Sequence, residues 1–237
     1  NSVEVLGDYA FYGCYKLTSV TIGNSVTNIG DGAFNSCSSL TSVTIGNSVT
    51  SIGDWAFMHC TNLTSVTIPN SVTSIGSSAF DGCYRLVEVI NKSSHITVTK
   101  GSTSNGRIGY YAISVSNNDD SYVPLVFTTD SNRFVSFNYG SDKILLNYVG
   151  TATDIIIPSG ITKINNYAFR NRDSLTSVTI GNSVEVLGDY AFRDCTNLTS
   201  VTIGNSVTSI GSQAFYYCSS LTSIEIPNSV TSIGSSS

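Results

Sequence analysis

The chain has 237 residues, of which 41% are hydrophobic and 11% are charged, and its formal net charge is −5 at pH 7. Because polyanions attract cationic proteins, this acidic balance argues against nucleic acid and anionic membrane surfaces as partners. The sequence holds no apolar run near the roughly 18 residues of a membrane span, so we expect no membrane insertion by this segment.

Residues 1–90 repeat one pattern every 23 residues. The landmark phenylalanines are Phe11, Phe34, Phe57 and Phe80. A fixed period of this kind is typical of a solenoid, in which each coil packs on its neighbours. The sequence starts and stops within a repeat, which indicates a fragment of a longer protein whose signal and anchor lie outside this segment.

Residues 40–62 represent one coil. The apolar residues expected to face the core are Leu40, Val43, Ile45, Val49, Ile52, Ala56, Phe57 and Cys60. The L-x-x-V-x-I start is rich in β-branched residues and predicts a strand, and residues 49–52 predict a second short extended piece. Residues 54–60 are too few for a stable isolated helix, so we expect a single helical or 3₁₀ turn there.

Cysteine and asparagine also recur with the period. The cysteines are Cys14, Cys37, Cys60, Cys83, Cys195 and Cys218, and the asparagines are Asn24, Asn47, Asn70, Asn182, Asn205 and Asn228. Stacked side chains run parallel, whereas a disulfide needs converging Cβ vectors, so we predict free, buried thiols. We expect the asparagine side chains to bond turn backbone groups from coil to coil.

Residues 91–151 break the rhythm, because Phe80 and Phe169 are 89 residues apart. We treat this segment as an irregular island within one continuous domain. Residues 134–139 and 143–148 predict a β-hairpin, and residues 101–106 and 116–121 predict loops. The island either carries binding or is a stretched set of coils that keeps the core continuous, and the sequence leaves both open.

Residues 152–237 resume the repeat, with Ile155 aligned to Val178 and further landmarks at Phe169, Phe192 and Phe215. The string NSVEVLGDYAF occupies both residues 1–11 and residues 182–192. We interpret this identity as a recent duplication.

The order I-P-x-x-V-x-x-I-G-x-x-A-F-x-x-C, present as IPNSVTSIGSSAFDGC at residues 68–83, resembles the BspA-like leucine-rich repeats of bacterial surface proteins. The resemblance covers residues 1–90 and 152–237. It implies a curved, mainly β solenoid with a parallel sheet, secreted or at the cell surface. It also implies adhesion to an extracellular protein or glycan, and it supplies no catalytic residue.

Two surfaces are candidates for binding such a partner. The outward residues of the opening strands would form hydroxyl rows that include Ser42, Thr44, Ser65 and Thr67. The turns around each Ala-Phe vary from coil to coil and include Trp55, Met58, Tyr190, Arg193 and Tyr216. Exposed aromatic residues and arginine are common contact anchors, so we expect specific binding at the turns or on the island.

Other functions fit less well. A regular Ser/Thr ladder could serve a surface layer or bind ice. A stacked-coil enzyme would need neighbouring carboxylates, for which the candidates are Asp119, Asp120, Asp130 and Asp142. These residues lie in turn-like sequence, and His59 and His95 are isolated, so we expect no enzyme, no metal and no cofactor. We expect the protein to be a monomer.

Overall fold

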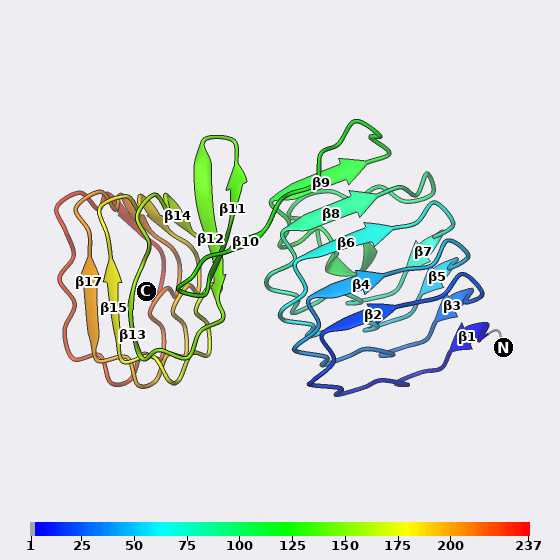
Figure 1. The fold of residues 1–237 in the computed structure, drawn as a ribbon, viewed down its shortest axis with the longest axis horizontal. Helices are drawn as coiled ribbons and strands as arrows, with labels where there is room; N and C mark the ends of the chain where they lie inside the picture. The colour runs from blue at the N-terminus through cyan, green and yellow to red at the C-terminus, as the bar shows by residue number, and fades with distance from the viewer. Residues whose placement is uncertain (1–2) are drawn as a thin grey trace. The chain divides into compact units, whose positions relative to one another are not determined.

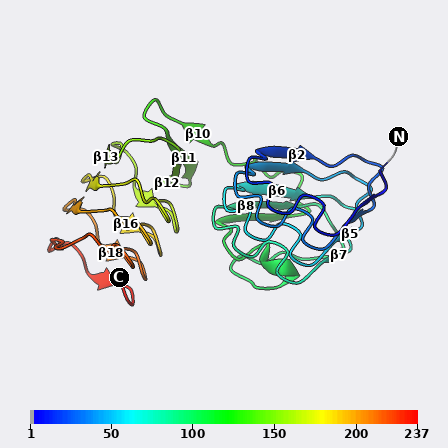
Figure 2. The same ribbon diagram turned by 90° about the horizontal axis from the view of Figure 1, so that it is seen from below.

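The computed structural model describes residues 3–237, so the first two residues of the repeat region 1–90 lie outside the described residues. The chain forms two compact units, unit 1 (Asn1–Pro124) and unit 2 (Leu125–Ser237). Each unit is a stack of coils built almost entirely from short strands and turns (Figures 1 and 2). The boundary falls inside the expected island, and each unit has its own hydrophobic core.

The coils of unit 1 contribute short opening and closing strands to two opposite walls. The opening strands are β2 (Ser19–Thr21), β4 (Ser42–Thr44), β6 (Ser65–Ile68), β8 (Glu88–Asn91) and β9 (Ser114–Asn117). The closing strands are β1 (Val5–Leu6), β3 (Asn28–Ile29), β5 (Ser51–Ile52) and β7 (Ser74–Ile75). All pairings within these walls are parallel, which confirms the predicted parallel sheet.

Unit 2 repeats this plan behind an antiparallel hairpin. The strands before the repeat are β10 (Thr128–Thr129), β11 (Phe134–Tyr139) and β12 (Asp142–Tyr148). The opening strands are β13 (Asp154–Ile156), β15 (Ser177–Ile180) and β17 (Ser200–Ile203), and the closing strands are β14 (Lys163–Ile164), β16 (Val186–Leu187), β18 (Ser209–Ile210) and β19 (Ser232–Ile233). The predicted hairpin is confirmed, since β11 and β12 pair from Phe134 and Tyr148 to Tyr139 and Asp142. The repeat resumes where expected, with Ile155 opposite Val178.

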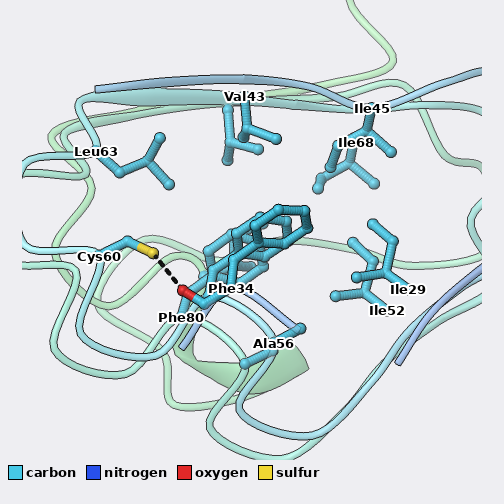
Figure 3. Close-up of a cluster of buried hydrophobic side chains, with 14 of the residues drawn as sticks. Ile29, Phe34, Val43, Ile45, Ile52, Ala56, Cys60, Leu63, Ile68 and Phe80 are labelled. Atoms are coloured by element: carbon cyan, nitrogen blue, oxygen red, sulfur yellow. Dashed lines mark hydrogen bonds between the residues drawn. The ribbon is translucent and has the colours of Figure 1, made fainter. Parts of the chain in front are cut away.

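The core of a coil is closed from three sides. Figure 3 shows Val43 and Ile45 on the opening side, Ile29 and Ile52 on the closing side, and the phenylalanine rings between them. All the residues expected inward in residues 40–62 are buried. The rings of Phe34 and Phe57 stack with centroids 5.3 Å apart, and those of Phe169 and Phe192 with centroids 4.7 Å apart. The strand spacing therefore carries over to the aromatic spine.

The segment around each phenylalanine is not the helical or 3₁₀ turn that we expected. Trp55 and His59, which flank Phe57, have positive φ angles of 55° and 59° and interrupt any helix. The amides of Met58 and Cys60 bond back to Trp55 and Phe57, whereas those of Phe57 and His59 bond forward to Ala79 and Asp81. Alternate amides thus close the turn and join it to the next coil. The sequence did not indicate this division, because left-handed residues are usually glycine or asparagine.

The first half of residues 91–151 adds a long coil to unit 1. Glu88 pairs with Ser114 and Asn91 with Asn117, so Ser116 and Asn117 end a strand rather than begin the predicted loop. The Asn117 side chain bonds the amide and the carbonyl of Val98, both at 2.9 Å, which holds the intervening chain against this strand. A short 3₁₀ helix, η1 (Asn105–Arg107), stands where the next Ala-Phe turn would be.

The second half of residues 91–151 begins unit 2. Ile144 and Leu145 of β12 pair in parallel with Lys163 and Ile164 of β14, so the hairpin extends the closing wall. Arg172 stands where other coils have cysteine, and its Nη2 donates a hydrogen bond to the Tyr148 carbonyl. The arginine therefore fastens the hairpin to the first full coil of the unit. The relation of the two units as one continuous domain stays a prediction.

Candidate interaction surface

The residues two positions before and after each landmark phenylalanine have left-handed backbone conformations. They include glycines, such as Gly32 and Gly82, but also Tyr167, Tyr190 and Tyr217, with φ of 61°, 58° and 58°. Such a conformation is costly for a bulky side chain and persists only where the surroundings impose it. Because glycine serves the fold at the same position, the fold alone does not explain the tyrosines. These positions hold the side chains that differ from coil to coil.

In unit 2 these turns build a continuous surface of tyrosine and arginine, which we call the Tyr–Arg ladder: Tyr167, Arg170, Tyr190, Arg193 and Tyr216. The Tyr167 and Tyr190 rings stack with centroids 4.8 Å apart and an interplanar angle of 6°. The Arg193 guanidinium lies 5.4 Å from the Tyr190 ring centre and 5.1 Å from that of Tyr216. Arg170 lies 5.8 Å from the Tyr167 ring centre. The cation–π contact of Arg193 with Tyr216 thus joins two successive coils, whereas the other two contacts lie within one coil.

Asp194 offsets part of the positive charge of the ladder. Its Oδ2 lies 3.3 Å from Arg193 Nε and 3.6 Å from Arg170 Nε. Arg193 Nη1 also donates to Gln213 Oε1 at 2.8 Å. A hydrogen bond with Tyr217 raises the pKa of the Tyr216 hydroxyl. The guanidinium groups are therefore held in fixed orientations before any partner arrives, which lowers the entropy cost of binding.

The structure brings together only some of the predicted site residues. Tyr190, Arg193 and Tyr216 lie in the ladder, whereas Trp55 and Met58 lie on a turn of unit 1, with Trp55 40% exposed and Met58 half-buried. Sequence reasoning missed Tyr167 and Arg170. The signal was present, because Tyr190 and Arg193 follow these residues at the repeat spacing.

The predicted hydroxyl rows lie on the opening strands. In Figure 3, Val43 of the opening strand β4 lies across the core from Ala56 of the turn. Ser42 and Thr44 are exposed on β4, and Ser65 and Thr67 are half-buried on β6. The row then changes, because Glu88 stands beside Ser65 and Ile90 beside Thr67. Glu88 is only 2% exposed and accepts a hydrogen bond from the Tyr122 hydroxyl at 2.9 Å. The Ser/Thr face is therefore short and interrupted. This disfavours a surface-layer or ice-binding function, which would need a regular row of hydroxyl groups.

The cysteine thiols serve the core rather than chemistry. Cys60 Sγ donates to the Phe34 carbonyl at 3.2 Å, and Cys195 Sγ to the Phe169 carbonyl at 3.1 Å. Burial raises the pKa of the Cys195 thiol to about 12. The thiolate is the nucleophile, so such a thiol is inert at neutral pH. The predicted free, buried state is confirmed for these cysteines, whereas Cys14 is free and half-exposed.

Three of the four acidic residues considered for catalysis act in local structure. Asp119 accepts hydrogen bonds from Ser121, which lower its pKa. Asp142 bonds Lys163 Nζ at 2.6 Å, and this contact lowers the pKa of the Asp142 carboxyl. Asp130 accepts from the Phe134 amide at 2.8 Å. Lowered pKa values suit solvated turns and ion pairs, not a general acid that must hold a proton at neutral pH.

Residues 3–237 contain no group of three or more His, Cys, Asp or Glu side chains that could hold a metal ion. Over the same residues, no helix has the length and apolar character needed to cross a membrane. The absence of catalysis and of cofactors stays a prediction.

Parallel coils with an L-x-x-V-x-I opening strand define a leucine-rich-repeat solenoid of the mainly β type. The family model described as "BspA type Leucine rich repeat region (6 copies)" matches residues 1–119 and 145–237, so the chain belongs to this family. The resemblance read from the repeat sequence is thereby confirmed.

Solved structures of bacterial proteins are similar to the chain. A leucine rich cell surface protein from Faecalibacterium prausnitzii is 29% identical, with a TM-score of 0.50, over 98% of this chain and 66% of that one. The pneumococcal vaccine antigen PcpA is 21% identical, with a TM-score of 0.49, over 98% of this chain and 50% of that one. The chain thus spans less than two thirds of either structure. No curated protein matches it.

Proposed function

We propose that this chain is a non-catalytic interaction module of a cell-surface or secreted bacterial protein, and that it binds an extracellular protein or glycan through the Tyr–Arg ladder. Membership of the BspA-type family supports an adhesion or protein-interaction role. The similarity to the F. prausnitzii protein, which is described as a cell surface protein, supports the location.

The observation that carries the proposal is the placement of Arg193 between the Tyr190 and Tyr216 rings, at 5.4 Å and 5.1 Å from their centres. Tyrosine and arginine are enriched among the residues that dominate binding energy at interfaces. Two of the ladder tyrosines, Tyr167 and Tyr190, occupy left-handed positions that glycine would adopt at lower cost. Tyrosine rings also offer flat faces on which an apolar or sugar surface can pack, while the guanidinium offers fixed donors.

The test is binding of the full chain to purified extracellular-matrix proteins and to a glycan array. The Tyr190→Ala and Tyr216→Ala variants should weaken binding to the recognised partner by at least tenfold, about 1.4 kcal/mol. The matched control is Tyr15→Ala, which removes a tyrosine that is 61% exposed outside the ladder. Trp55→Ala and the Ser42→Ala/Thr44→Ala double variant test the other predicted surfaces.

Unchanged affinity in both ladder variants, with a loss in Trp55→Ala or in the hydroxyl-row variant, would move the binding site to unit 1. Absence of binding to every matrix protein and glycan would contradict the proposed partner class. Circular dichroism of each variant establishes that the fold is retained.

A further inference from the structure

The two walls of unit 2 do not begin at the same place. On the closing wall, β14 is preceded by β12, which pairs with it in parallel. On the opening wall, β13 pairs with β15 on one side, and among residues 3–237 no strand pairs with its other side. The hairpin therefore supplies the missing closing strand but not the missing opening strand, so β13 is one of the two edge strands of the three-stranded opening sheet β13-β15-β17.

The bare edge presents backbone groups that are available for pairing. The Thr153 carbonyl accepts from the Thr176 amide at 2.7 Å, and the Ile157 amide donates to the Thr179 carbonyl at 2.9 Å. The amide and carbonyl of one strand residue point to the same edge, and consecutive residues alternate between edges. Those of Asp154 and Ile156 therefore point away from β15, toward the open side.

A cavity of about 320 Å³ lies at this edge. Its walls come from β13 and from the hairpin side, where Phe134 and Tyr148 supply aromatic rings and Asn132 and Ala152 line the rim. The Phe134 and Tyr148 rings lie 4.8 Å apart and are buried. A side chain pointing inward from a strand added beside β13 would face this cavity, at the position where Val178 and Val201 of the later coils pack in or against the core.

The residues of β13 depart from the repeat in a way that suits a strand partner. Ile156 stands where the next strands have Thr179 and Thr202, and it is 71% exposed. Asp154 stands at a serine position, but its Oδ1 accepts from Ser177 Oγ at 2.6 Å and from Thr176 Oγ1 at 3.0 Å. The carboxylate is thus held toward β15 and does not block the open edge.

We infer that the open edge of β13 is a docking site for an extended segment of a partner protein, which adds a strand to the opening wall and places a β-branched apolar side chain against the Phe134 and Tyr148 side of the cavity. In strand addition, main-chain hydrogen bonds provide affinity, and alternate side chains provide specificity. The proposed site is separate from the Tyr–Arg ladder.

The occupant follows from continuity with the contact between coils. Every later opening strand of unit 2 receives a parallel neighbour with an S-V-T-I sequence, as β15 pairs with β17. The cavity has room for an extended backbone with one or two side chains, near the lower limit for ligand sites, and not for a folded domain. An extended peptide with alternating β-branched residues therefore fits the site. A glycan would leave the edge amides without regular backbone partners and would place polar groups against the apolar part of the cavity.

The probe is a fluorescent peptide with the sequence of residues 175–181 (LTSVTIG), titrated by anisotropy against the full chain. Ile156→Pro removes the outward amide, and proline is tolerated at a strand edge. Ala152→Trp fills the rim of the cavity. Each change should weaken peptide binding at least tenfold. Thr202→Val, at a position that faces outward in a later coil, should leave it unchanged, as should Tyr216→Ala in the ladder.

Saturable binding that Ile156→Pro and Ala152→Trp weaken, while both controls bind normally, supports the docking site. Failure of the peptide to bind, or equal binding by Ile156→Pro with retained circular dichroism, overturns it. Self-association of the wild-type chain that Ile156→Pro abolishes would assign the edge to a second copy and also overturn the proposed occupant. The Tyr–Arg ladder is tested with its own variants and probes. Failure of the β13 docking proposal therefore leaves the proposed function of the ladder standing, and the reverse also holds.

Discussion

Residues 3–11 and 184–192 have the same sequence in two different settings. The first lies in the N-terminal coil of unit 1, where Phe11 is 40% exposed, and the second lies inside unit 2, where Phe192 is 0% exposed. Leu6 is half-buried, whereas its twin Leu187 is fully buried. The same string thus adopts the same turn and strand in both places, but its burial depends on having a coil on each side.

The comparison teaches that the stability of a coil resides in its contacts with neighbours. The amides of Gly188 and Glu185 bond the preceding coil at Ile164 and Thr162, at 2.9 Å and 2.8 Å. Gly7 and Glu4 have no preceding coil among the described residues. Forward contacts are equal, since Phe11 and Phe192 both donate to the alanine of the following coil at 2.8 Å. The twins therefore differ on one side only.

The largest difference is expected from removing the twin phenylalanines. Phe192→Ala should cost about 4 kcal/mol of unfolding free energy, because the cavity opens between two stacked rings that cannot close it. Phe11→Ala should cost about 1–2 kcal/mol, because one face already meets solvent. Urea unfolding followed by circular dichroism measures both. Equal losses of unfolding free energy in the two variants would show that each phenylalanine ring stabilises the protein through contacts within its own coil rather than with neighbouring coils.

The twin glycines give the next effect. A Cβ at Gly188 would lie 2.5 Å from the Asn166 amide nitrogen, whereas a Cβ at Gly7 meets nothing within 4 Å. Gly188→Ala should therefore destabilise by about 2 kcal/mol through overpacking against backbone. Gly7→Ala should be neutral or slightly stabilising, because alanine narrows the unfolded ensemble. A destabilising Gly7→Ala would contradict the difference in space around the two glycines.

The buried thiols predict a loss of stability at alkaline pH. Burial raises the pKa of Cys195 from 9.0 to about 12, so the folded state holds this proton more tightly than the unfolded state. The contribution is complete below pH 9 and is lost as the pH rises toward 12. By pH 10 the loss of unfolding free energy amounts to about 1 kcal/mol.

Urea midpoints measured from pH 8 to pH 10 should fall less steeply in Cys195→Ala than in the wild type. The half-exposed twin Cys14 should react with a thiol reagent in the folded protein, whereas Cys195 should react only after unfolding. Equal reactivity of the two thiols would refute the burial difference.

The smallest effect concerns the twin aspartates, which should behave alike. Asp8 Oδ1 accepts from the Asp31 amide at 2.8 Å, and Asp189 Oδ1 accepts from the Ser212 amide at 2.7 Å. Both contacts face the following coil, which is present in both settings. Asp8→Ala and Asp189→Ala should each cost about 1 kcal/mol. A clear difference between these two losses of unfolding free energy, measured by urea unfolding, would contradict this expectation. It would show that the two settings differ in more than the contacts with a preceding coil.

The sequence predicted the coil well, because a fixed period places the same residue in the same environment each time. The asparagine ladder is an example, since the Asn47 amide donates to Asn24 Oδ1 at 2.9 Å and the Asn205 amide to Asn182 Oδ1 at 2.8 Å. The turn at residues 54–60 was not predicted, because its left-handed tryptophan and histidine are imposed by bonds to the next coil. Secondary-structure propensity depends on the local sequence and cannot predict hydrogen bonds to another coil.

The irregular segment and the surface were harder to predict. Strand β9 extends to Asn117 because it pairs with β8. The local sequence is rich in turn-forming residues and therefore predicted a loop instead. The Tyr–Arg ladder was found in part, through Tyr190, Arg193 and Tyr216, because aromatic residues in variable turns stand out. The open edge of β13 depends on where the hairpin stops pairing, which is a property of topology rather than of any motif.

Amide hydrogen exchange of the twin strings tests the central claim most directly, because identical local sequences have nearly equal intrinsic exchange rates. The account predicts that the amides of Glu185, Gly188 and Asp189, which bond the preceding coil, exchange at least about 100-fold more slowly than those of Glu4, Gly7 and Asp8. The amides of Phe11 and Phe192, which both bond the following coil, should differ less. Equal protection across both strings would contradict the claim that neighbouring coils stabilise each repeat.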